Sequence, residues 1–190
     1  MSNRHNHLLS FAVAVAALGS AGAMAQTMGF GCPTPGTKIT NSAGATVVMG
    51  KQEGFFCKAD HSAFGAGEVY AMLYYFNPTR RRDPSVAKYI DPVAAERIWP
   101  LTVGKRYTGK ATLGGGTYTL DYAVTGTETL ATPMGPQPTF VVELNESGTD
   151  GYTAKQKWWL SPTFKYVLKG EFSDSRGANV KISTTGIAGP

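Results

Sequence analysis

The pattern of apolar and polar residues predicts a chain built from β-strands. Beyond residue 100, runs of aromatic, aliphatic and β-branched residues alternate with clusters of Gly, Pro, Asn and Ser. Bulky side chains recur at every second position in Tyr118, Leu120, Tyr122 and Val124, which is the period of a strand with one covered face. The strands predicted in this half are 105–113, 117–130, 139–144, 152–160, 166–172 and 180–185. Such short spacing indicates an antiparallel meander.

The first half of the chain carries shorter strand signals and the chain's helical signal. We predict strands over 45–49, 54–58 and 69–76, the last of which is apolar on both faces and must therefore be covered on both. Asp83-Pro84 and Asp91-Pro92 each place a capping residue before a proline suited to a first helical turn. One or two short helices are predicted between residues 84 and 98.

These elements together predict a mainly β fold. We expect an antiparallel meander of about nine strands that forms a curled sheet, a half-barrel or a barrel, with one short helical insertion. Residues 26–190 are long enough for a single domain with its own core. The Gly- and Pro-rich stretch at its start predicts an irregular N-terminal arm over residues 26–44.

Residues 1–25 have the order of a secretory signal peptide. A polar, basic start is followed by an apolar stretch over 8–18 and by Ala23-Met24-Ala25, a small-residue cleavage site. The apolar stretch is short of the roughly 20 residues that span a bilayer. We therefore expect a periplasmic or secreted protein that begins at Gln26 and has no transmembrane segment, with peripheral membrane contact left open.

Charge and cysteine content refine this expectation. The formal net charge of +5 favours contact with acidic envelope polymers or lipid headgroups and does not single out nucleic acid, which we do not expect as a partner. Cys32 and Cys57, the two cysteines, are predicted to form a disulfide in an oxidising compartment. A reactive thiol pair or a pair of metal ligands are the alternatives.

Few residues remain for catalysis. His5 and His7 lie in the predicted signal peptide, which leaves His61, whereas a zinc site normally takes three or four ligands. The sequence lacks the common metalloprotease, P-loop and nucleophile-elbow motifs. Asp60, His61 and Ser62 read as a polar turn, because adjacent residues rarely converge on one another. We expect no catalytic residue, metal or cofactor, although carboxylates on several strands keep a hydrolase open as an alternative.

The candidate binding residues are aromatic side chains and an arginine cluster. Trp158 and Trp159 must point to opposite faces of a strand, and an outward tryptophan would be a docking candidate. The arginine cluster, Arg80 to Arg82, would pair with anions, or would protect a sheet edge from pairing with another chain. The complete candidate set is Tyr74, Tyr75, Trp99, Trp158, Trp159, Arg80, Arg81 and Arg82.

The C-terminal half also resembles a known group of proteins. Its succession runs through Thr117 to Leu120, Val124 to Thr129, the turn at Pro133 to Pro138, Trp158 to Pro162 and Tyr166 to Lys169. It is similar, over roughly residues 100–172, to exported Gram-negative proteins of a domain-of-unknown-function group described as TapB-like. The resemblance implies an antiparallel β-clam in the cell envelope and carries no catalytic residue.

Our favoured hypothesis is an exported, non-enzymatic cell-envelope protein. It would bind an apolar or anionic envelope-derived ligand, or a protein partner, on a curled β-sheet, with the arginines as an anion-holding rim. The alternatives are a structural or host-facing protein that acts by surface contact, and a carboxylate-dependent hydrolase.

Overall fold

The computed structural model describes residues 27–73, 77–78 and 95–190. The predicted signal peptide, most of the predicted helical insertion, and the candidates Tyr74, Tyr75 and Arg80 to Arg82 lie outside the described residues. Within the described part, η2 (Ala95–Ile98) is a short 3₁₀ helix, and no helix there is long and apolar enough to cross a membrane.

An antiparallel sheet of eleven strands dominates the described residues, in the order β6-β5-β4-β3-β2-β13-β12-β11-β10-β9-β8. In chain order its strands are β2 (Lys38–Asn41), β3 (Thr46–Glu53), β4 (Phe56–His61), β5 (Gly65–Tyr70), β6 (Asn77–Pro78), β8 (Arg106–Leu113), β9 (Gly116–Thr132), β10 (Gly135–Gly148), β11 (Thr153–Ser161), β12 (Tyr166–Asp174) and β13 (Asn179–Ala188). The short strands β1 (Thr27–Met28) and β7 (Leu101–Thr102) pair separately. The mainly β, meandering fold is confirmed.

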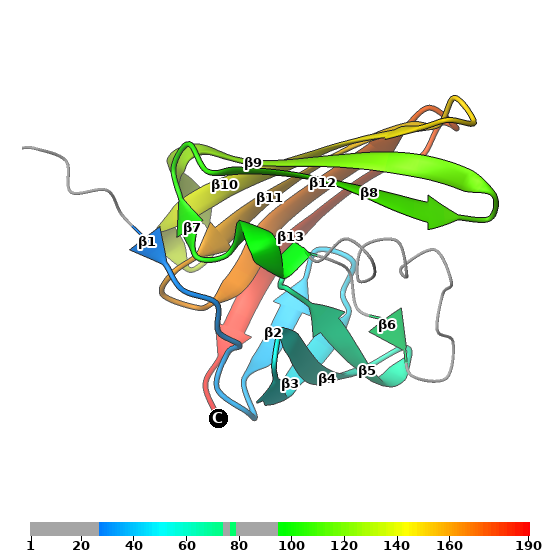
Figure 1. Ribbon diagram of the computed structural model, residues 1–190. Helices are drawn as coiled ribbons and strands as arrows, with labels where there is room; N and C mark the ends of the chain where they lie inside the picture. Colours follow the sequence, from blue (N-terminus) through cyan, green and yellow to red (C-terminus); the bar gives the residue numbers. More distant parts are fainter. Residues whose placement is uncertain (1–26, 74–76, 79–94) are drawn as a thin grey trace, which may run out of the picture.

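Strand β13 joins the two halves of the sheet. Its first part, from Asn179 to Ser183, pairs with β12, and its second part, from Thr184 onward, pairs with β2 across a register shift before Gly186. A bulge of this kind bends a strand and increases its twist. The half formed by β8–β12 and the half formed by β2–β5 thus diverge from β13, as Figure 1 shows, which makes the sheet curled.

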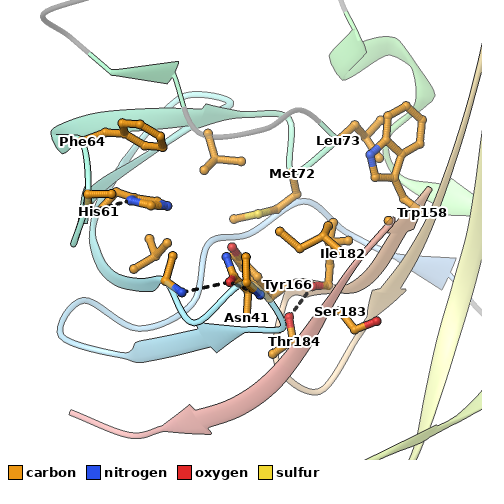
Figure 2. A pocket seen from close by; sticks show the side chains of 17 residues that line it. Asn41, His61, Phe64, Met72, Leu73, Trp158, Tyr166, Ile182, Ser183 and Thr184 are labelled. Atoms are coloured by element: carbon orange, nitrogen blue, oxygen red, sulfur yellow. Dashed lines mark hydrogen bonds between the residues drawn. The ribbon is translucent and has the colours of Figure 1, made fainter. Parts of the chain in front are cut away.

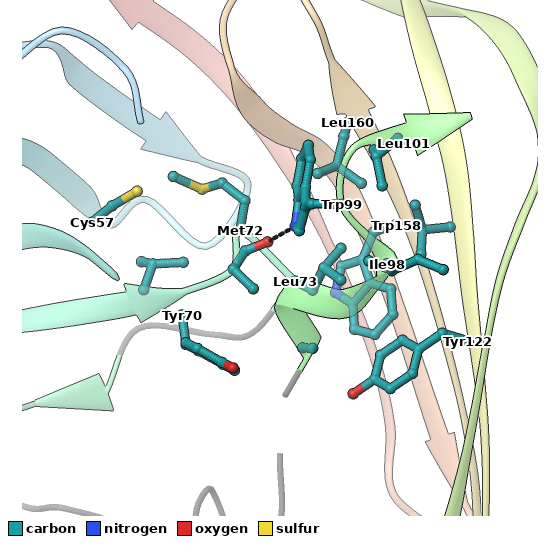
Figure 3. Close-up of a cluster of buried hydrophobic side chains, with 14 of the residues drawn as sticks. Cys57, Tyr70, Met72, Leu73, Ile98, Trp99, Leu101, Tyr122, Trp158 and Leu160 are labelled. Carbon is teal, nitrogen blue, oxygen red and sulfur yellow. Dashed lines mark hydrogen bonds between the residues drawn. The ribbon is translucent and has the colours of Figure 1, made fainter. Parts of the chain in front are cut away.

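The hydrophobic core lies between these two halves. Trp158 and Tyr122 reach it from the long strands, while Met72, Leu73 and Ile98 reach it from the connections between the halves (Figure 3). Each of these side chains is nearly inaccessible to water, and burial of such a side chain stabilises the fold by about 1.5 to 3 kcal/mol. The core therefore holds the halves of the sheet against one another.

The strand predicted over 69–76 ends early. Strand β5 stops at Tyr70, because Ala71 and Met72 have φ values of 50° and 55°, a left-handed conformation that ends a strand. The Ala71 carbonyl accepts a hydrogen bond from Trp99 Nε1 at 3.0 Å. The apolar residues from Val69 to Leu73 are buried, as predicted, but Ala71 to Leu73 form a buried turn in place of a longer strand.

The N-terminal arm is more regular than its composition predicts, since β1 and β2 lie within residues 26–44. The disulfide between Cys32 and Cys57 is confirmed, with a Cα–Cα distance of 5.7 Å and a sequence separation of 25. Closure of a loop of that length is worth about 3 kcal/mol in the chain-entropy description. The disulfide therefore ties the arm to β4.

Candidate functional site

A cavity of about 380 Å³ opens between the two halves of the sheet. This volume lies within the range of small-molecule sites, roughly 300 to 1,000 Å³. Strands β3 and β5 and the turn that follows β5 form one side, and β11, β12 and β13 form the other (Figure 2). Its apolar lining includes Val47, Val69, Met72, Leu73, Trp158 and Ile182.

Strand register explains why the cavity exists beside Trp158. Trp158 pairs with Gly170 on β12, and Gly170 pairs with Ile182 on β13, so the three positions form one row on the inner face of the sheet. Gly170 has no side chain to fill the space between its neighbours. All three residues line the cavity, which indicates that this row opens it.

The polar residues of the cavity are largely fixed by the backbone. Asn41 Oδ1 accepts hydrogen bonds from the N–H groups of Ala43 and Ala45 at 3.0 and 3.1 Å. Thr184 Oγ1 donates to the Val167 carbonyl at 2.9 Å. These bonds hold the β2–β3 turn and the β12–β13 pair in the positions that shape the wall.

His61 lies at the end of the cavity opposite Trp158 in Figure 2. Its Nδ1 accepts a hydrogen bond from the Ala63 N–H at 3.1 Å, which places the proton of the neutral imidazole on Nε2. Burial lowers the pKa of His61, so the neutral ring is favoured. Phe64, whose ring centroid lies 4.7 Å from that of His61, is 54% exposed and forms an apolar rim.

Tyr166, at the start of β12, brings a hydroxyl group to the cavity wall. Burial alone raises the pKa of Tyr166 to about 12, because the phenolate is disfavoured away from water. No hydrogen-bond partner for this hydroxyl occurs in the described part of the chain. Tyr166 is therefore a neutral polar residue in the wall of an apolar space.

The structure separates the three candidate tryptophans. Trp158 lines the cavity. Trp159 is buried on the opposite face, where its Nε1 donates to Glu128 Oε2 at 2.7 Å and Lys169 Nζ lies 4.2 Å from its ring centroid. Trp99 is in the core and does not line the cavity (Figure 3). Only Trp158 of these three is thus in contact with the site.

The predicted polar turn begins later than expected, because Asp60 and His61 are the last residues of β4 and only Ser62 lies in the turn to β5. Asp60 is exposed, and Ser62 Oγ accepts a hydrogen bond from the Thr46 N–H at 3.0 Å. Of the three residues, only His61 lines the cavity.

Sequence reasoning did not identify Asn41, His61, Met72 or Tyr166 as binding residues. In the sequence, Asn41 lies in the predicted irregular arm, His61 in a predicted polar turn, Met72 in a strand-like apolar run and Tyr166 at the start of a predicted strand. These signals are local, whereas the cavity depends on how the halves of the sheet face one another.

Comparison with protein families finds one match, to the family described as Protein of unknown function (DUF3108), over residues 37–182. This match agrees with the prediction of a domain of unknown function, while the TapB-like group stays a prediction. No curated protein matches the chain.

Solved structures similar to this chain include the hypothetical lipoprotein YmcC from Escherichia coli K12, with 13% identity, 81% of this chain and 84% of that chain covered, and a TM-score of 0.44. A protein of YmcC-like fold from Bacteroides fragilis, described as exported, has 11% identity to this chain. The match covers 86% of this chain and 100% of that chain, with a TM-score of 0.41. A protein from Parabacteroides distasonis, described as a lipoprotein, has 13% identity to this chain. The match covers 85% of this chain and 99% of that chain, with a TM-score of 0.41.

Proposed function

We propose that this chain, which belongs to the family Protein of unknown function (DUF3108), is an exported protein that binds an apolar ligand between the two halves of its curled sheet. The observation that carries the proposal is the apolar cavity of about 380 Å³. Transfer of a ligand's apolar surface from water into such a space is the main driving force for binding of this kind.

Features of the cavity rim and wall support the proposal. Phe64 presents an exposed aromatic ring beside the opening, where an apolar molecule would first make contact. Met72, an adaptable side chain suited to ligands of varied shape, lies on the wall. Rim and wall together favour an extended apolar ligand over a surface contact with a protein.

Export is part of the same proposal. The predicted signal peptide at residues 1–25 and a disulfide, which persists in oxidising compartments, both support a periplasmic or secreted location. An envelope-derived ligand is the class of molecule that such a protein would meet. The anion-holding role of Arg80, Arg81 and Arg82 remains a proposal, since they lie outside the described residues.

Replacement of Ala45 by phenylalanine tests the proposed site. Ala45 lines the cavity, so the Ala45→Phe side chain would occupy ligand space. We expect the affinity for the neutral fluorescent probe N-phenyl-1-naphthylamine to fall by roughly tenfold or more, the factor that corresponds to about 1.4 kcal/mol. The measurement is a fluorescence titration of the folded variant.

The matched control is Ala131→Phe, because Ala131 is exposed on β9 and does not line the cavity. Its affinity for the probe should stay within about twofold of the wild-type value, a change of less than 0.5 kcal/mol. Equal affinity of both variants and the wild type, or no binding by the wild type, would contradict the proposed function.

A further inference from the structure

The geometry of the cavity points to one ligand class: we propose an uncharged long-chain acyl ester or amide, whose carbonyl oxygen is held by the Tyr166 hydroxyl and the Asn41 carboxamide. This inference rests on the proposed function and specifies its ligand. Two positive features carry it, namely hydrogen-bond donors gathered on one wall and an environment that disfavours charge.

The two donors belong to strands on either side of β13. Asn41 ends β2 and pairs with Thr184 on β13. Thr184 in turn donates to the carbonyl of Val167, the neighbour of Tyr166 on β12. Asn41, Thr184 and Tyr166 are consequently grouped on the same side of the cavity, below Met72 in Figure 2.

The hydrogen bonds already made determine what this wall offers. Both hydrogen bonds to the Asn41 side chain engage its Oδ1, which leaves the side-chain NH₂ group, a pure donor. No acceptor for that group, and no partner for the Tyr166 hydroxyl, occurs among the residues that the structure describes. The complementary ligand atom is an acceptor, and a carbonyl oxygen can accept two hydrogen bonds.

The electrostatic environment selects against a free fatty acid. Burial lowers the pKa of His61 and raises that of Tyr166 to about 12, so both groups are shifted toward their neutral forms. The described residues that line the cavity include no Lys, Arg, Asp or Glu. A carboxylate placed here would lose its hydration without an opposite charge, which is costly, whereas an ester carries no such charge.

The rest of the cavity suits the acyl chain. Figure 2 places Phe64 at one end and Trp158 and Leu73 at the other. An unbranched chain that lies between these ends contacts apolar side chains on both halves of the sheet.

Displacement of bound N-phenyl-1-naphthylamine tests the inference with two ligands of equal chain length. Methyl dodecanoate should displace the probe at a concentration at least tenfold lower than dodecanoate at about pH 8, where a carboxyl with a pKa near 4 is ionised. Tyr166→Phe keeps the ring and removes the donor. We expect Tyr166→Phe to weaken the binding of methyl dodecanoate by roughly two- to tenfold more than the binding of the probe, as loss of one net hydrogen bond predicts.

Tyr152→Phe is the matched control, since the Tyr152 hydroxyl bonds to Asp174 Oδ2 at 3.4 Å and Tyr152 does not line the cavity. Tyr152→Phe should change neither the affinity for the probe nor the affinity for methyl dodecanoate. Equal displacement by the ester and by dodecanoate, or an equal effect of Tyr166→Phe on probe and ester, would overturn this inference and leave the proposed function standing. Failure of the wild type to bind the probe would overturn both.

Discussion

At the scale of single residues, strand alternation gives adjacent tryptophans different roles. Trp158 faces the cavity, and Trp159 is covered on the outer face by Lys157, Lys169 and Glu128. Cation–π contacts with Lys157 and Lys169 and the indole hydrogen bond to Glu128 stabilise Trp159 on the outer face. The burial of Trp159 therefore stabilises the sheet, whereas Trp158, which is also buried, forms part of the cavity wall.

This difference predicts the optical response to a ligand. Methyl dodecanoate should change the intrinsic fluorescence of the wild type, and Trp158→Phe should remove more than half of that change, because Trp158 is the tryptophan that lines the cavity. Trp159→Phe is the matched control and should retain the change. A response that persists in Trp158→Phe and disappears in Trp159→Phe would place the ligand on the outer face.

The sequence allowed only part of the site to be predicted. Trp158 could be identified because a pair of tryptophans on a strand must divide between two faces. Tyr166 and His61 could not, since their proximity to the cavity depends on β13 bringing β12 alongside β2. Residue type and local spacing do not determine that arrangement of strands.

At the scale of elements, the hairpins from β8 to β13 were predictable because clear turn residues separate them. The predicted turn over 133–138 is shorter in the structure, and β10 already begins at Gly135. Pro136 and Pro138 fit this strand because β11 pairs with β10 only from Phe140 onward, and proline is tolerated where no neighbour needs its missing N–H.

The turn after β5 was not predictable, because nothing in the apolar run over 69–76 signals left-handed residues. Ala71, with φ of 50°, adopts a conformation that costs a residue with a Cβ about 1 to 2 kcal/mol and glycine little. We expect Ala71→Gly to lower the free energy of unfolding by about 1 kcal/mol less than Ala59→Gly does. Ala59 is the control, since it is also buried but lies in the regular strand β4.

Urea denaturation of both variants measures this difference, provided that the slope of the unfolding free energy is unchanged. A larger loss of stability in Ala71→Gly than in Ala59→Gly would show that the left-handed turn carries no backbone cost.

At the scale of the whole molecule, the site is a consequence of one sheet that changes partner along β13. The register shift between Thr184 and Gly186 separates the part of β13 paired with β12 from the part paired with β2. The core fills the space between the halves, and the row of Trp158, Gly170 and Ile182 leaves the cavity beside it. We propose that an apolar ligand occupies this space.

Nuclear magnetic resonance of methionine methyl groups tests that claim directly during a titration with methyl dodecanoate. Met72 lines the cavity, whereas Met28 lies in β1 and Met134 lies in the β9–β10 turn, and each signal is assigned by a Met→Leu variant. If the ligand binds in the cavity, the Met72 signal shifts to saturation while the Met28 and Met134 signals stay unchanged. An unchanged Met72 signal, with a shift at Met134 or at no methionine, would contradict binding in the cavity.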